Sequence, residues 1–336
     1  MSERAQQVPG TFDSSVAVEL AAADRSGFVE NRHVGSAIVL SSDGERVLAL
    51  GDPDAAILPR SALKPFQAVG SVTAGAVLDP EQTALATASH AGTARHVAVV
   101  RGVLASVGLD DSALRCPPAL PADARSRDEL LRGGGGAAPI YMECSGKHAG
   151  MLAACVAAGW SVDDYLDARH PLQQHIKDVV ERLTGEKASH TAVDGCGAPD
   201  FAITLAGLAR GLHRMATASA QSPFALFRNA AGVLRSARQH PWAISGDGRP
   251  DTVLMETLGG YAKAGADGVM TQSLPDGTTV AVKVLGGSIP AARVAAIGVL
   301  ARTGAIDGAN ARAALEAVDA TVLGGGAPVG HLRPVV

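Results

Sequence analysis

The chain has 336 residues, of which 47% are hydrophobic, 18% charged and 3% aromatic. This length allows about two domains of roughly 150 residues each, and the balance of apolar and charged residues excludes a disordered chain. The net charge is −4 and Lys/Arg-rich runs are absent, so nucleic acid is not expected as a main partner.

The chain contains no stretch of about 18 consecutive apolar residues, so we expect no membrane association. Its N-terminus, MSERAQQVPGTFDSS, is polar and lacks the apolar segment of a secretory signal, which favours a cytoplasmic protein. Because cytosolic thiols stay reduced, the four cysteines are expected to be metal ligands, reactive thiols or core residues. Cys155 lies in an apolar helical run and is interpreted as core, whereas Cys116, in the loop CPPALP, receives no role.

Short apolar segments near the start predict strands, and Ser42-Asp43-Gly44 predicts a hairpin turn between the last two. The predicted strands are Val16–Leu20, Ser36–Ser41 and Arg46–Gly51. From Ser61 the apolar residues recur with a helical period. The predicted helices are Ser61–Val77, Pro80–Ala88, Arg95–Val107, Gly146–Ala158, Pro171–Leu183, Phe201–Leu212 and Pro223–Gln239.

Strand patterns return late in the chain, and two more helices follow them. These elements are the strands Gly268–Ser273 and Thr278–Leu285 and the helices Pro290–Arg302 and Asn310–Val318. Strands at both ends of the chain, separated by helices, predict an α+β fold with one antiparallel sheet flanked by helices. We expect residues 1–14 to be flexible, Gly133–Gly136 to form a mobile loop, and Gly324–Val336 to be a poorly packed tail or arm.

The first chemical motif is Ser61-Ala62-Leu63-Lys64, at the start of a predicted helix. Residues three apart lie on one helix face, so the Lys64 amine can approach the Ser61 hydroxyl as in a Ser-Lys nucleophile pair. A second serine follows at Ser89, and Lys263-Ala264-Gly265 precedes a late predicted strand. This order of motifs is typical of active-site serine acyl-transferases, although each motif is short enough to occur by chance.

The second chemical motif contains the cysteines. Cys144-Ser-Gly-Lys147-His148 opens a predicted helix, and Cys196 lies between two glycines about fifty residues later. Two cysteines with one further ligand form an incomplete tetrahedral zinc set. The competing interpretation is a reduced Cys144–Cys196 pair without metal.

Three longer motifs resemble the L-asparaginase II family of rhizobial-type, thermolabile enzymes. They are RSALKPFQA at 60–68, ECSGKHAGM at 143–151 and VDGCGAP at 193–199. Shorter matches, ENRHVG at 30–35 and KAGADG at 263–268, extend the resemblance over about residues 15–330. It implies one catalytic region at 15–330, with strands from 15–60 and 250–325 and helices from about 61–249.

The resemblance also implies a fold like serine β-lactamases and glutaminases, a homodimer, and hydrolysis of L-asparagine to L-aspartate and ammonia. Ser61 and Lys64 match the family's first Ser-Lys pair, and Ser89 matches its second serine. Lys263 is the best match for the lysine partner of Ser89, and Lys283 competes with it. The remaining matches are Cys144, Lys147 and Cys196, which can hold zinc, and Arg60, His148 and Asp194 at substrate positions.

The chain departs from the family pattern in one loop. Where the family usually shows C-G-x-H-x-P, this chain has Cys116-Pro-Pro-Ala-Leu-Pro121 and lacks the histidine. Other serine hydrolases on the same scaffold, a glutaminase or a β-lactamase-like enzyme, therefore stay open, as does a non-catalytic homologue that binds a small molecule. The sequence also leaves open whether Ser61 or Ser89 is the nucleophile.

Overall fold

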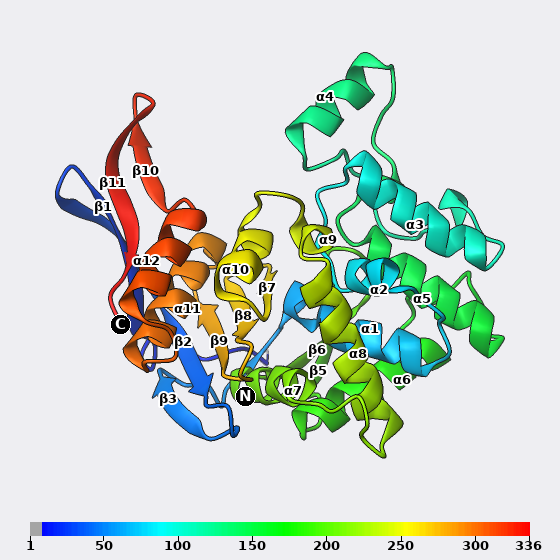
Figure 1. The fold of residues 1–336 in the computed structure, drawn as a ribbon, viewed down its shortest axis with the longest axis horizontal. Coiled ribbons are helices and arrows are strands. Elements are labelled where there is room, and N and C mark those ends of the chain that lie inside the picture. Colours follow the sequence, from blue (N-terminus) through cyan, green and yellow to red (C-terminus); the bar gives the residue numbers. More distant parts are fainter. Residues whose placement is uncertain (1–8) are drawn as a thin grey trace, which may run out of the picture.

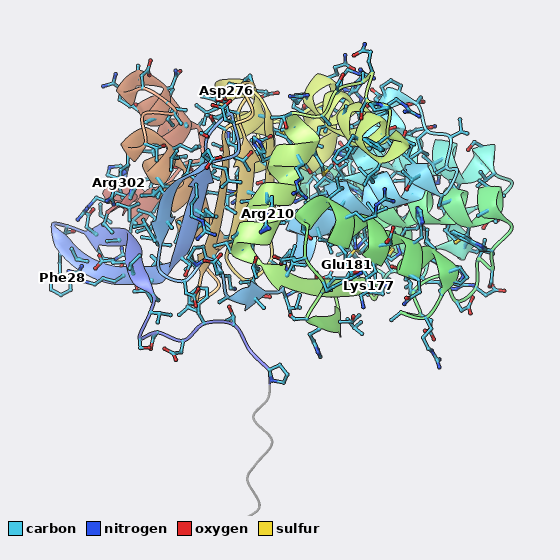
Figure 2. The ribbon with its side chains drawn as sticks, turned by 90° about the horizontal axis from the view of Figure 1, so that it is seen from below. Phe28, Lys177, Glu181, Arg210, Asp276 and Arg302 are labelled. Atoms are coloured by element: carbon cyan, nitrogen blue, oxygen red, sulfur yellow. The ribbon has the colours of Figure 1, made fainter. Side chains whose placement is uncertain are left out.

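The structure is a computed structural model that describes residues 9–336. Part of the predicted N-terminal segment, residues 1–8, therefore lies outside the described residues. An antiparallel sheet stands on one side of the molecule and a helical region on the other (Figures 1 and 2). This arrangement confirms the α+β fold that the sequence predicts.

The main sheet has eight strands in the order β10-β11-β1-β2-β9-β8-β7, and β3 pairs with β2. The strands are β1 (Val18–Arg25), β2 (Phe28–Leu40), β3 (Arg46–Leu50), β7 (Tyr261–Gly265), β8 (Val269–Ser273), β9 (Thr279–Val284), β10 (Thr321–Gly324) and β11 (Ala327–Pro334). Strands from the two ends of the chain thus meet at the β2–β9 pair.

A second, three-stranded sheet has the order β4-β6-β5. Its strands are β4 (Ala56–Ile57), β5 (His190–Val193) and β6 (Pro199–Thr204). The helices are α1 (Lys64–Thr73), α2 (Pro80–Ala86), α3 (Ala94–Ser106), α4 (Ala124–Arg132), α5 (Ser145–Ala158), α6 (Pro171–Thr184), α7 (Leu205–Ala216), α8 (Ala225–Gln239), α9 (Trp242–Ser245), α10 (Pro250–Leu258), α11 (Ile289–Arg302) and α12 (Gly308–Ala317).

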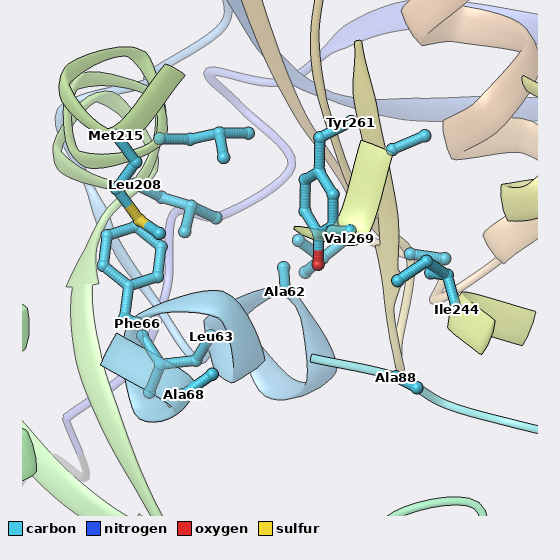
Figure 3. Packing of buried hydrophobic residues seen from close by; sticks show 14 of the residues in the cluster. Ala62, Leu63, Phe66, Ala68, Ala88, Leu208, Met215, Ile244, Tyr261 and Val269 are labelled. Atoms are coloured by element: carbon cyan, nitrogen blue, oxygen red, sulfur yellow. The ribbon is translucent and has the colours of Figure 1, made fainter. Parts of the chain in front are cut away.

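The core joins the sheet to the helical region. Helix α11 packs on β9, β8 and β1, α7 packs on β9 and β2, and α1 lies among α5, α6 and α8. At this junction Ala62 lies beside Tyr261 of β7, and Phe66 lies beside Met215 of α7 (Figure 3). All four side chains are buried. Most of the core side chains are small or aliphatic, which permits close approach of backbone segments.

Two sequence predictions need correction. The predicted helix Phe201–Leu212 is strand β6 as far as Thr204, and α7 begins only at Leu205. The Thr204 hydroxyl accepts the Gly207 N–H as an N-cap, and a short buried apolar run cannot distinguish strand from helix. The C-terminal tail, predicted to be poorly packed or an arm, is an ordered strand of the main sheet, because β11 pairs with β1 and β10, but each of its residues is exposed or half-buried.

Within residues 9–336, none of the helices has both the length and the apolar character needed to cross a membrane.

We expect Gly35→Ala to destabilise the sheet. Gly35 lies opposite Val284 on β9, and a Cβ at this position would stand 2.0 Å from the Lys283 carbonyl oxygen. Because backbone cannot move aside easily, the free energy of unfolding in urea should fall by about 1–3 kcal/mol or more. Gly136→Ala is the control, since a Cβ there meets no atom within 4 Å. Equal stability of the two variants would contradict the prediction.

Candidate functional site

The Ser61 motif forms a tight turn rather than the start of a regular helix. Residues Arg60–Leu63 make one 3-10 turn, and α1 follows from Lys64. Ser61 is 9% exposed. The turn packs against the end of β7, where a Cβ on Gly265 would lie 2.4 Å from the Pro59 carbonyl oxygen. Only glycine therefore allows β7 to approach the turn that carries Ser61.

Lys64 reaches Ser89 and not Ser61. Its fully buried amine donates to Ser89 Oγ at 2.7 Å and to the Ala88 carbonyl oxygen at 2.6 Å. Within the described residues, no hydrogen bond joins the Lys64 amine to the Ser61 hydroxyl, and only the Lys64 backbone N–H donates to the Ser61 carbonyl oxygen. The lysine of the first motif thus contacts the serine of the second, a pairing that spacing on one helix could not predict.

Lys263 is engaged with a carboxylate. It lies within β7, 1% exposed, with Nζ 3.3 Å from Asp251 Oδ2 and 2.7 Å from the Ala264 carbonyl oxygen. Asp251 also accepts from Arg293 of α11 at 3.1 Å. Burial lowers the pKa of Lys263, with the Asp251 charge opposing this shift and the nearby Lys64 adding to it.

The competing lysine, Lys283, donates to the carbonyl oxygen of Asp267. Among residues 9–336, neither Lys263 nor Lys283 makes a hydrogen bond to Ser89, so Lys64 takes the place expected for them.

The two cysteines of the second motif lie together with a carboxylate. Ligand atoms of Cys144, Cys196 and Asp194 are all within 4.8 Å of one another. Lys147 Nζ donates to Cys196 Sγ at 3.0 Å, and Asp194 Oδ2 lies 3.3 Å from the same sulfur. Two sulfurs with a carboxylate and an amine beside them are a donor set that suits zinc. We call Cys144, Lys147, Asp194 and Cys196 the sulfur cluster.

The charges in the sulfur cluster favour a thiolate at Cys196. A hydrogen bond from Cys144 lowers the pKa of Cys196 to about 6, against burial and with help from the Lys147 charge. The same hydrogen bond, together with burial, raises the pKa of Cys144. Burial by itself would lower the pKa of Lys147, but the charges of both sulfurs and of Asp194 raise it above its usual value. Cys196 is therefore ready to bind a cation.

The other two cysteines do not join this cluster. All four cysteines lie in the described part of the chain and are free and buried. Cys155 is a core residue of α5, as expected. Burial raises the pKa of Cys116 to about 12, and its thiol donates to the Pro139 carbonyl oxygen at 3.4 Å.

Arg60 connects the serine turn to the sulfur cluster. Its Nε donates to Asp194 Oδ1 at 2.8 Å and its Nη1 pairs with Asp267. Burial alone would raise the pKa of Asp194, but the charge of Lys147 and the hydrogen bond from Arg60 lower it to about 2. Two residues expected at substrate positions, Arg60 and Asp194, thus form an ion pair.

His148 is deeply buried. Its Nδ1 lies 2.7 Å from the Tyr165 hydroxyl, and Nε2 has no hydrogen-bond partner within residues 9–336. Burial, with the charge of Lys147, lowers its pKa to about 3, so the imidazole is neutral at pH 7.

Sequence reasoning missed the residues that hold the Ser89 loop. The His90 N–H donates to the Glu143 carbonyl oxygen, and His90 Nε2 lies 2.9 Å from Ser145 Oγ. These bonds fix the loop to the segment that carries Cys144. Ser-His is too common a dipeptide to signal this role, and its partner is 55 residues away in sequence.

A buried lysine on a serine hydroxyl is the arrangement typical of Ser-Lys amide and ester hydrolases. The model of the L-asparaginase II family matches residues 21–334, so the chain belongs to this family. Membership indicates an amidohydrolase, as the sequence motifs predict. No curated protein matches the chain.

Solved structures show weaker similarity. Two crystal structures of Mglu in its native form, one in 4.3 M NaCl, have TM-scores of 0.42 at 13% and 15% identity, and cover 82% and 81% of this chain. The chain spans 66% and 61% of those Mglu chains. A candidate β-lactamase from Bacteroides dorei has a TM-score of 0.39 at 16% identity, with 74% of this chain and 84% of that chain covered. Similarity at this level establishes no shared activity.

A pair of neutral histidines makes the site sensitive to acid. His90 and His96 stack with ring centroids 5.1 Å apart, and the Thr93 N–H donates to His96 Nδ1. Burial lowers the pKa of His96 to about 4. In the unfolded chain a histidine takes up its proton near pH 6.5, so stability is full above that pH and is lost as the pH falls towards 4.

We therefore expect the free energy of unfolding of His96→Gln to depend less on pH below pH 6.5 than that of the wild type. The free energy of unfolding of the wild type should lose on the order of 2–3 kcal/mol more than that of the variant between pH 7.5 and pH 4. Urea unfolding at several pH values measures this, with the exposed His331→Gln as control. Parallel curves for wild type and His96→Gln would refute the expectation.

Proposed function

We propose that this chain hydrolyses L-asparagine to L-aspartate and ammonia through an acyl-enzyme on serine, with Lys64 as the base. The observation that carries the proposal is the 2.7 Å contact between Lys64 Nζ and Ser89 Oγ, in a protein of the L-asparaginase II family. Lys64 is fully buried, and Ser61 lies three residues before it, in the 3-10 turn that leads into α1. Both serines are thus candidates for the attacking hydroxyl.

The proposed reaction has two halves that use one base. Lys64, acting as the base, takes the serine proton as the hydroxyl oxygen attacks the side-chain amide carbon of the substrate. The lysine then gives that proton to the departing nitrogen, ammonia leaves, and an aspartyl ester remains. Water attacks the ester with Lys64 again as base, and L-aspartate and the free serine are regenerated.

Arg60 and Asp194 support recognition of an amino acid. Arg60 uses Nε and Nη1 for its carboxylate partners, and its Nη2 has no hydrogen bond within residues 9–336. This nitrogen can donate to the substrate α-carboxylate, and Asp194, on the other side of the ion pair, can accept from the α-ammonium.

Cys144, Cys196 and Asp194 would hold a zinc ion, with the Lys147 amine beside them. When bound, zinc would supply positive charge that orients the substrate. Without it, Lys147 itself provides the positive charge that stabilises the Cys196 thiolate.

We expect Lys64→Met to reduce kcat for L-asparagine by about 10³-fold or more, because loss of a general base costs about 10²–10⁴ and Ser89 loses its hydrogen bond to the Lys64 amine. Ammonia release measures the rate. Lys187→Met is the matched control, since Lys187 is 86% exposed and pairs with Glu181 at the surface. Retention of wild-type kcat in Lys64→Met would overturn its role as base.

The same assay decides the substrate and the nucleophile. Turnover of L-asparagine should exceed that of L-glutamine and of a β-lactam; preference for either would favour another serine hydrolase, and ligand binding without any turnover a non-catalytic homologue. Ser61→Ala and Ser89→Ala identify the attacking serine, because only loss of the nucleophile abolishes the aspartyl-enzyme mass in quenched reactions. An acyl-enzyme that persists in both variants would contradict the mechanism.

We expect protein purified without chelator to contain about one zinc ion per chain, and Cys196→Ser to lose it, because the Cys196 thiolate is the readiest ligand. Elemental analysis measures the content. Cys155→Ser is the control, because that sulfur lies in the core of α5 away from the sulfur cluster. Zinc-free wild type, or equal zinc in both variants, would favour a metal-free thiol pair.

A further inference from the structure

The chain enters the Ser61 turn through a strained residue. Arg60 has φ +52°, in the left-handed region that non-glycine residues seldom occupy because it is strained. It persists only where surrounding structure holds it. Arg60 directly precedes Ser61. The contact that holds the Arg60 backbone therefore also sets the orientation of Ser61 in the turn.

The small sheet brings one side chain to this backbone. In the β4–β6 pair, Ala56 lies opposite Thr204 and Ile57 opposite Ile203. The same register, continued for three residues, would place Arg60 opposite Asp200. The ladder ends at Ile57, and Pro59 has no N–H to extend it. Instead, the Arg60 N–H donates to the carboxylate oxygen Oδ2 of Asp200 at 3.2 Å.

Asp200 is itself firmly placed. It is 2% exposed and pairs with Ala192 of β5 in the small sheet. The carbonyl oxygen of the preceding Pro199 accepts from Gln67 Nε2 of α1 at 3.4 Å. Asp200 Oδ1 has no partner within residues 9–336, and the Arg60 Nε stands 4.0 Å from Oδ2. A buried carboxylate with one hydrogen-bonded oxygen is costly, so its presence here calls for a specific role.

We propose that Asp200 is the positioning residue of the serine turn. Its carboxylate takes the place of a missing ladder bond, holds Arg60 in the left-handed conformation, and so orients Ser61 and the Arg60 guanidinium together. Gly265 of β7 packs closely against the same turn. This proposal rests on the proposed function, because it gives the turn its catalytic purpose. Asp200 acts through Arg60 and needs no contact with substrate.

The test compares Asp200→Asn with Asp200→Ala. Asparagine keeps an oxygen that can accept the Arg60 N–H, whereas alanine leaves that N–H without its acceptor. We expect Asp200→Ala to lower kcat/KM for L-asparagine by about 10- to 100-fold, and Asp200→Asn to stay within about threefold of wild type. Asp276→Ala removes a comparable carboxylate bond to the Thr278 N–H in a distant turn and should leave kcat unchanged.

Crystal structures of the variants provide a readout that is independent of turnover. In Asp200→Ala, φ of Arg60 should leave the left-handed region and Ser61 should move, whereas Asp200→Asn should keep both. Asp200→Ser, whose hydroxyl is too short to reach Arg60, replaces the alanine variant if that variant does not fold.

An unmoved Ser61 in the alanine or serine variant, or an asparagine variant as impaired as alanine, would overturn the proposal. If the wild type does not hydrolyse L-asparagine, the proposed function fails, and the Arg60 conformation in these structures still decides the role of Asp200.

Discussion

Three lysine amines buried in a core of small aliphatic side chains are the constraint on which the rest of the site depends. An amine removed from water must find acceptors, and each of these lysines finds a different kind. Lys64 donates to a serine hydroxyl, Lys147 to a thiol and Lys263 to a carboxylate. The hydrogen-bond partner therefore distinguishes the three lysines. Lys64 is placed to act on a hydroxyl, Lys147 stabilises a thiolate, and Lys263 forms an ion pair.

Close backbone approach brings together the segments that carry these long side chains. Gly265 lets β7 touch the serine turn, and Gly35 lets β2 lie against the Lys283 carbonyl on β9. Few aromatic rings are present to keep the segments apart. The low aromatic and high glycine content is thus the packing condition for a site in which a strand, a 3-10 turn and two loops converge.

The charges of the site form one connected system. Arg60 joins the serine turn to Asp194, and Asp194 lies beside the Cys196 sulfur. Any ligand that displaces Arg60 from Asp194, or any cation bound by the two sulfurs, would change the field at the serine turn. The proposed contact of Arg60 with the substrate α-carboxylate and the proposed zinc ion are therefore electrostatically coupled, although different elements of the fold provide them.

The sequence by itself determined the family and the α+β class and predicted the candidate reactive side chains, because long motifs and hydrophobic periods are local. Spacing placed Lys64 near Ser61, but only the tertiary structure decided that its amine meets Ser89, on a loop 25 residues away. Likewise the sequence of β6, a short buried strand, fits a helix equally well, and only its pairing with β4 and β5 defines it as a strand. Asp200 carried no motif at all, since its role depends on a backbone N–H 140 residues away that the chain brings close only by folding.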